Sequence, residues 1–185
     1  DEIWKQYYNI IKCANSAIEA LDNYGQHCTT DAQKATNKAY IGEVKFMRAY
    51  AYFRLVQAFG AVTILRDNNQ TDLTRSTVDA VYKYALEDLE YGMTYMPRIR
   101  PNQSEHKGAV TAFSAATLAA KIYLNQGNYQ KVKELTNDII EHGNFHLYPD
   151  YYQLWKIPGK LCDESIFECQ CTDFGNDKPR SEERR

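Results

Sequence analysis

The sequence predicts an all-α protein built from antiparallel helical hairpins. Apolar residues recur at helical spacing in five segments of the 185-residue chain, and polar or glycine-containing stretches separate these segments. Apolar residues make up 44% of the chain, which contains only five prolines. This composition is typical of a folded domain and not of a disordered chain. A chain of this length buries about 70% of its unfolded surface, so we expect a single ordinary core.

The first two helices are predicted from their apolar patterns. The first covers residues 3–23, and the polar residues 24–36 form a loop or a weak helix start. The second covers about residues 37–59 and carries apolar side chains on two faces, which indicates a helix buried between neighbours. Gly60 follows its last turn, where glycine commonly ends a helix.

The third helix follows two stretches without helical periodicity. Residues 61–65 are predicted to be a short extended piece, and residues 66–77 a polar loop. Thr77 has the side chain of a good N-cap for a helix over residues 78–96. Pro97 stops this helix.

The last two helices form the tightest predicted hairpin. They follow a polar loop at residues 98–108 and cover residues 110–125 and 129–142, with Gly143 closing the second. The first of the two is rich in alanine, which lets a partner helix approach closely. The run AAKIYLNQGNYQKVKEL is similar to a tetratricopeptide-like hairpin, in which we expect Tyr129 to pack across both helices.

The C-terminal part departs from this pattern. Residues 148–157 are predicted to be an aromatic loop or a short helix, and residues 165–170 one strand. The stretch 176–185 is almost wholly polar, so we expect a flexible tail. The predicted organisation is therefore one helical domain over residues 1–175, followed by this tail.

Charge and hydropathy argue against two kinds of partner. The 22 basic and 24 acidic residues are interspersed and give a net charge of −2, so we expect no nucleic acid. The chain contains no run of about 18 apolar residues that could span a membrane. A zinc site would combine Cys169 and Cys171 with Cys162 or a histidine, but zinc sites usually show paired cysteine clusters, so this alternative is the weaker one. We expect no metal and no cofactor.

The acidic residues do not suggest a catalytic site. Glu87, Asp88 and Glu90 are close in sequence but diverge by about 100° per residue on a helix, so we expect a solvated surface and not converging acids. Motifs for a phosphate loop or a serine nucleophile are absent. Arg48 lies in a dense apolar helix, where we expect it to pair with an acid, such as Glu43 or Glu87, or to extend its head towards water.

Five ordered segments carry a resemblance to a known family. Residues 42–62 read GEVKFMRAYAYFRLVQAFGAV, and a W-xx-YY-xx-I-xx-AN motif precedes them at residues 4–15. Arg, Val-Tyr, Asp-Leu and Met-Pro follow within residues 75–97, then AAKIYL and GNY within 119–129, and ESIFE at 164–168. In this order the segments resemble the SusD-like (RagB/SusD) family of Bacteroidetes surface lipoproteins.

The resemblance implies a fold, a location and a partner. The fold would be the SusD-like superhelix of tetratricopeptide-like hairpins. The protein would be a non-enzymatic lipoprotein exposed on the outer membrane, which delivers glycans or oligopeptides to a SusC-like, TonB-dependent transporter. Its lipid anchor would be attached to a cysteine before Asp1, so we expect this chain to be a fragment of a longer protein.

Candidate ligand residues are chosen by their chemistry. Sugar binding combines an aromatic face with planar polar side chains, and these are present at Trp4 and in the loop at Asp67, Asn68 and Asn69. The alternatives are that Trp4 packs at a helix entry and that the asparagines form an ordinary turn. We expect the aromatic residues at 151, 152 and 155 to be core.

Two functions remain open at this point. The first is a SusD-like protein that captures glycans or other nutrients. The second is a tetratricopeptide-like scaffold that binds only a protein partner.

Overall fold

The computed structural model describes residues 2–169, and this part of the chain is helical, as predicted. Five long helices follow one another along the chain. They are α1 (Glu2–Gly25), α2 (Asp31–Phe59), α3 (Val78–Tyr95), α4 (Ala112–Asn125) and α5 (Tyr129–His142). Three short helices complete the described part, namely η1 (Pro101–Gln103), α6 (Tyr151–Leu154) and η2 (Ile157–Gly159). None of the helices in residues 2–169 is long and apolar enough to cross a membrane.

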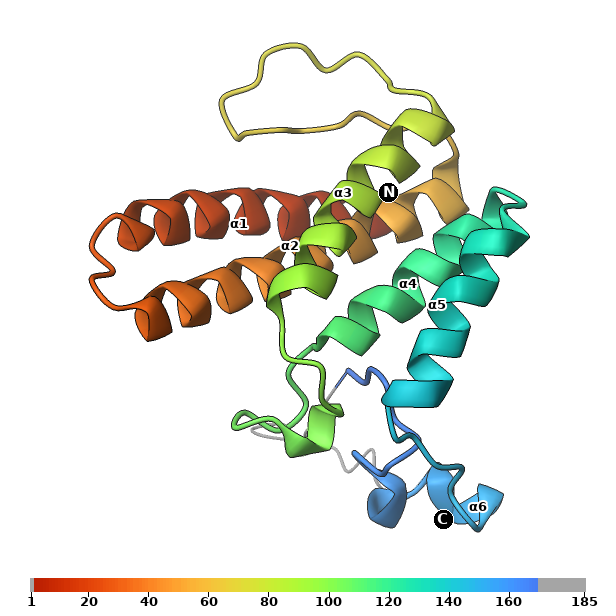
Figure 1. Cartoon of the computed structure of the whole chain (residues 1–185). Helices are drawn as coiled ribbons and strands as arrows, with labels where there is room; N and C mark the ends of the chain where they lie inside the picture. The colour runs from red at the N-terminus through yellow and green to blue at the C-terminus, as the bar shows by residue number, and fades with distance from the viewer. Residues whose placement is uncertain (1, 170–185) are drawn as a thin grey trace, which may run out of the picture.

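Each long helix packs against the next one along the chain (Figure 1). The core lies around α2, which is covered by α1 on one side and by α3 on the other. Its side chains Phe46, Tyr52 and Leu55 are almost fully buried, which confirms the prediction of a helix between neighbours. Ala115 and Ala119 of α4 are also fully buried, as expected for small residues that admit a neighbouring helix.

The second helix begins six residues earlier than predicted, at Asp31. Thr30 is its N-cap, and its hydroxyl accepts from the backbone N–H of Gln33 at 3.2 Å. The Gln33 side chain accepts in turn from the backbone N–H of Thr30 at 3.2 Å. This reciprocal pair satisfies helix-end donors that would otherwise lack partners, so the polar stretch before residue 37 is helical.

The other helix bounds agree closely with the predictions. Thr77 caps α3 through its hydroxyl, Gly60 ends α2 with φ of 71°, and α5 has its predicted bounds. The fourth helix starts at Ala112, two residues later than expected. Its preceding residue Thr111 has extended backbone and donates its N–H to the Ser114 hydroxyl at 3.1 Å.

Two local predictions are wrong. Tyr129 does not pack across the α4–α5 hairpin, because 70% of it is exposed. Residues 165–169 are irregular and do not form a strand. The carbonyl of Ile166 accepts from the Ser114 hydroxyl at 2.8 Å and Phe167 packs edge-on to Phe46, so α2 and α4 hold this segment through side chains and not through a strand ladder. Gln170 and the tail at 176–185 lie outside the described residues.

Candidate functional site

The loop between α2 and α3 is fixed to the helices by buried side chains. The Tyr8 hydroxyl donates to the carbonyl of Thr63 at 2.8 Å, and the backbone N–H of Leu65 donates to the Tyr52 hydroxyl at 2.8 Å. Asn15 donates from Nδ2 to the carbonyl of Leu65 at 3.1 Å. Burial raises the pKa of Tyr52, so its hydroxyl stays neutral. The start of the loop is therefore a rigid platform for the residues that follow.

A buried ion pair lies beneath this loop. Arg48 donates from Nε to Asp88 Oδ2 at 2.7 Å and from Nη2 to Asp88 Oδ1 at 2.8 Å, a bidentate arrangement. Lys45 also donates to Asp88, and Arg48 Nη1 donates to Asn15 Oδ1 at 2.7 Å. Although burial opposes its charge, the bonds to Asp88 raise the pKa of Arg48. This network joins α1, α2 and α3.

The network confirms one prediction about charged residues and corrects another. Arg48 pairs with an acid as expected, and that acid is Asp88, where Glu43 and Glu87 were the examples considered. Asp88 is only 2% exposed, so it does not belong to the solvated surface of α3. Glu87 and Glu90 are exposed there.

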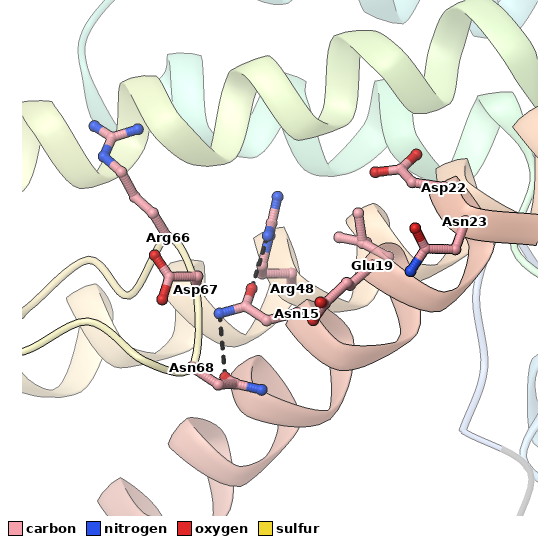
Figure 2. Close-up of a pocket in the computed structure, with 9 residues that line it drawn as sticks. Asn15, Glu19, Asp22, Asn23, Arg48, Arg66, Asp67 and Asn68 are labelled. Atoms are coloured by element: carbon pink, nitrogen blue, oxygen red, sulfur yellow. Dashed lines mark hydrogen bonds between the residues drawn. The ribbon is translucent and has the colours of Figure 1, made fainter. Parts of the chain in front are cut away.

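A polar pocket opens above the network (Figure 2). Its volume is about 260 Å³. Helix α1 supplies most of the lining, α2 supplies Arg48, and the loop supplies the remainder (Asn15, Ile18, Glu19, Asp22, Asn23, Arg48, Arg66, Asp67 and Asn68). Figure 2 shows Arg66, Asp67 and Asn68 on one side of the pocket, with Asp22 and Asn23 on the other.

The structure brings together two of the four predicted ligand residues. Asp67 and Asn68 line the pocket, whereas Asn69 and Trp4 do not. Asn68 donates to the Ser16 hydroxyl at 2.8 Å and to the carbonyl of residue 12 at 3.0 Å, which attaches the loop to α1. Asp67 accepts from the backbone N–H of Asn69 at 2.8 Å, a turn that leaves its second carboxylate oxygen available.

Trp4 lies apart from this pocket. Its ring centroid is 4.8 Å from that of Tyr8 and 5.1 Å from that of Phe59. It thus packs at the start of α1 against the end of α2, which corresponds to the helix-entry alternative for this residue.

Sequence reasoning missed the contribution of α1 to the pocket. Asn15, Glu19 and Asp22 share one face of α1 because side chains three or four residues apart point the same way. Within residues 2–169, no hydrogen bond engages the carboxylates of Glu19 and Asp22, so both are available to a ligand. Helical spacing was the signal that could have grouped them.

The charges around the pocket favour a neutral, hydroxyl-rich ligand over an anion. Three carboxylates line it (Glu19, Asp22 and Asp67), against the guanidinium groups of Arg48 and Arg66. The charge of Arg48 is matched by Asp88, and Arg66 lies 5.2 Å from the ring of Tyr84. The remaining carboxylates can accept from hydroxyls, and Arg66 can donate.

No group of three or more metal-binding side chains is arranged to hold an ion within residues 2–169. Cys162 and Cys169 of the zinc alternative are free thiols, and Cys171 lies outside the described residues.

The aromatic residues near the C-terminal end are exposed, which corrects the expectation that they are core. Tyr151, Tyr152 and Trp155 have exposed fractions of 74%, 62% and 68%. Figure 1 shows α6 beyond the end of α5, away from the stack of long helices. Tyr151 packs edge-on to Trp155, and Lys156 lies over the ring of Tyr152, but none of the long helices in residues 2–169 covers them.

Comparison with known proteins identifies the family. A family model for SusD-like proteins, described as "Starch-binding associating with outer membrane", matches residues 1–124. The chain belongs to the SusD-like family. A SusD-like protein of Bacteroides ovatus is 26% identical over 93% of this chain and 33% of its own length.

Solved structures agree with this assignment. Surface glycan-binding protein A from Bacteroides fluxus superposes with a TM-score of 0.77 at 27% identity, over 89% of this chain and 35% of that one. A protein solved with a xylogluco-oligosaccharide superposes with a TM-score of 0.76 at 25% identity, over 90% of this chain and 35% of that one. The SusD-like chain described here therefore spans about a third of the length of these relatives.

The SusD-like motifs of the sequence meet in the buried network. Asn15 ends the first motif, Arg48 lies in GEVKFMRAY, and Asp88 begins the Asp-Leu pair. Arg48 donates to both Asn15 and Asp88 and so links the three. In this SusD-like chain, part of the sequence resemblance thus lies in residues that join the helices, and two of them, Asn15 and Arg48, also line the pocket.

Proposed function

We propose that the SusD-like protein to which this chain belongs captures glycans, or oligopeptides, at the cell surface. The observation that carries the proposal is the match of residues 1–124 to a family described as starch-binding and associated with the outer membrane. A relative named as a surface glycan-binding protein supports the same ligand class. In this proposal the protein is a lipid-anchored lipoprotein of the outer membrane and acts without catalysis.

Delivery to a SusC-like, TonB-dependent transporter completes the proposed function. A captured glycan or oligopeptide must be carried across the outer membrane. A stack of helical hairpins offers the extended surface that a large protein partner, such as the transporter, requires. The alternative is a scaffold that binds the transporter alone. It differs in a measurable way, because it would co-purify with the barrel but bind no glycan.

The pocket beside Asp67 and Asn68 is the proposed contribution of this part of the chain to the ligand site. Its carboxylates would accept hydrogen bonds from sugar hydroxyls, and Arg66 would donate to ring or hydroxyl oxygens. Its small volume, about 260 Å³, suits one sugar unit at the end of a longer chain. Trp4 packs outside the pocket, so we do not assign it a stacking role there.

Calorimetric titration of the full-length protein with a panel of neutral polysaccharides and peptides tests the proposal. We expect binding to at least one member, and Asp22→Ala and Arg66→Ala should each weaken it about tenfold, which is the effect of losing about 1.4 kcal/mol. Asp72→Ala is the matched control, because Asp72 lies in the same loop but does not line the pocket. If no member of the panel binds, ligand capture is contradicted. If a ligand binds but its affinity is the same for wild type and both pocket variants, only the assignment of the pocket is contradicted.

A further inference from the structure

Asn15 lines the polar pocket, but its amide is already engaged on both sides. The residue is only 7% exposed, and its Oδ1 accepts from Arg48 Nη1 at 2.7 Å. Its Nδ2 donates to the carbonyl of Leu65 at 3.1 Å and to Asn68 Oδ1 at 3.5 Å, which uses both of its hydrogens. Figure 2 shows Asn15 between Arg48 and Asn68. Asn15 is therefore a poor candidate for direct contact with a ligand.

The orientation of the Asn15 amide is set by Arg48. A guanidinium can only donate, so the amide oxygen, and not the amide nitrogen, must face it. Arg48 is itself held by its bidentate bonds to Asp88. The Asn15 nitrogen is therefore turned towards the loop between α2 and α3, where both of its neighbours are acceptors.

Asn68 is oriented from the opposite end. Its Nδ2 donates to the carbonyl of Lys12 at 3.0 Å and to the Ser16 hydroxyl at 2.8 Å. Because a carbonyl can only accept, the Asn68 nitrogen must point at α1, and its oxygen is left to face Asn15. Donors and acceptors thus match along the whole path from Asp88 through Asn15 to the loop.

The two sides of the pocket are held in place by different means. Within residues 2–169, no hydrogen bond or ion pair engages the guanidinium of Arg66, which lies 5.2 Å from the centre of the Tyr84 ring. Its backbone N–H donates to the side chain of Gln70, a residue of the same loop. Asp22, by contrast, belongs to α1 and is placed by that helix. The position of Arg66 therefore depends on how firmly the loop is attached.

We propose that Asn15 is a positioning residue of the ligand pocket, which transmits the fixed geometry of the Arg48–Asp88 pair to the loop that carries Arg66. Asn15 touches no ligand and acts only through this loop. A ligand then meets a wall that is already in place, so binding loses less affinity to the ordering of the loop. The inference rests on the proposed function, because the pocket is the ligand site assigned there.

Asn15→Asp breaks the link at one end only. The new carboxylate can still accept from Arg48, but it has no hydrogen to donate and places an oxygen against the carbonyl of Leu65. The variant should fold, because Arg48 and Lys45 share the one carboxylate of Asp88 and a second carboxylate balances the extra positive charge.

Hydrogen exchange of the full-length protein without ligand is the first measurement. We expect the amides of residues 66–69 to exchange at least about tenfold faster in Asn15→Asp than in wild type, whereas those of α2 change by less than about twofold. Asn9→Asp is the matched control, the same substitution at an exposed position of α1 outside the pocket, and should leave the loop unchanged. Equal loop exchange in wild type and Asn15→Asp would overturn the proposal, whether or not a ligand is found.

A second variant keeps this measurement decisive if circular dichroism shows that Asn15→Asp is unfolded. Asn15→Leu has nearly the same shape, carries no charge and also lacks the donor. It should accelerate exchange at residues 66–69 by a similar factor. Unchanged loop exchange in folded Asn15→Leu would overturn the proposal as well.

A double-mutant cycle separates positioning from general destabilisation, with maltoheptaose and a xylogluco-oligosaccharide as probes. Arg66→Ala should weaken binding about tenfold in wild type but less than about twofold in Asn15→Asp, because a released loop no longer holds Arg66 at the ligand. Asp22→Ala should weaken binding about tenfold in both backgrounds, because α1 holds Asp22.

The outcomes of the cycle distinguish this inference from the proposed function. Equal losses for Arg66→Ala in the two backgrounds would overturn the positioning role of Asn15. A loss for Asp22→Ala that also disappears in Asn15→Asp would overturn it too, because the whole pocket would then be disturbed. If neither probe binds wild type, that result counts against the glycan proposal alone, and hydrogen exchange decides the role of Asn15.

Discussion

Asp88 forms ion pairs with two cations, Arg48 and Lys45, in a nearly dry site, and its loss should be costly. Asp88→Ala leaves the 6%-exposed Arg48 without its bidentate partner. Removing one partner of a buried ion pair costs about 3–5 kcal/mol, so the free energy of unfolding should fall by that amount. Urea unfolding followed by circular dichroism measures the change.

Two further variants make this prediction specific. Glu87→Ala changes the neighbouring, exposed carboxylate and should shift the free energy of unfolding by less than about 0.5 kcal/mol. The double variant Arg48→Met with Asp88→Leu removes both charges and should recover most of the lost stability, because apolar replacement of a buried pair is often neutral. A double variant as unstable as Asp88→Ala would contradict this account.

Glu43 should destabilise the chain at neutral pH. Burial raises the pKa of Glu43, and the charge of His106 opposes this only in part. A carboxyl group whose pKa is raised by folding favours the folded state when protonated, so its cost is present above the folded pKa and vanishes below the unfolded value of about 4.3. Glu43→Gln should therefore raise the Tm by about 1–2 °C at pH 7.

The pH dependence of this effect is the decisive measurement. Thermal unfolding of wild type and Glu43→Gln should differ at pH 7 and converge below about pH 4. A variant less stable than wild type at pH 7 would show that the carboxylate has a favourable partner.

Whether a residue of α3 is buried depends on which face of the helix carries it, and this decided which residue-level predictions were right. Val81, Ala85, Leu89 and Gly92 form the buried stripe of α3, and Asp88 lies on the same face by helical spacing. The apolar spacing predicts the helix that carries this stripe, but the carboxylates beside it were treated as one exposed cluster. Which neighbour enters the core depends on the partner that faces it, here Arg48 of α2, and that partner is set by packing across helices.

Two glycines set the approach of α2 to α3. A Cβ on Gly42 would lie 2.8 Å from Met96 Cγ and 3.4 Å from the Cα of Gly92, whereas a Cβ on Gly92 would lie 2.8 Å from the terminal methyl of Met96. That methyl can swing aside, but Cγ and the backbone cannot move easily. Gly42→Ala should therefore destabilise the chain by about 1–3 kcal/mol.

Gly92→Ala serves as the matched comparison. It gains helix propensity of about 1 kcal/mol. Its one short contact is with the flexible end of Met96, and its distances to Ala115 Cβ (3.4 Å) and to the Gly42 carbonyl oxygen (3.6 Å) are ordinary van der Waals contacts, so its free energy of unfolding should be unchanged or higher. Chemical denaturation of the two variants side by side measures the difference, and equal destabilisation would mean that backbone approach does not decide tolerance at Gly42.

The elements were mostly predictable because each helix carries its own period and end signals. Thr77, Gly60 and Pro97 marked ends that the structure confirms. The start of α2 was misplaced because residues 31–36 are all exposed and therefore show no apolar period. The signal there was Thr30 with Gln33, a capping box, which was not recognised.

At the scale of the whole molecule, exposure of apolar residues was the feature that sequence could not supply. Leu124, Ile140 and Trp155 look like core residues in any local pattern, yet all three are more than half exposed here. Burial is a property of the completed fold, and this chain spans about a third of the length of its relatives. The polar pocket was half predicted for a similar reason, because its two walls lie about 50 residues apart in the sequence.

Local stability should therefore decline along the stack in the 185-residue chain. Eleven residues of α2 are buried, whereas Ile139 is the buried residue of α5 among those described. In a solenoid each repeat is stabilised by its neighbours, and amides exchange by local opening where few apolar contacts hold them. Hydrogen exchange should be at least about tenfold faster in α5 than in α2, a difference of about 1.4 kcal/mol in opening free energy. Equal protection of α5 and α2 in the 185-residue chain would show that α4 alone suffices to hold the last helix.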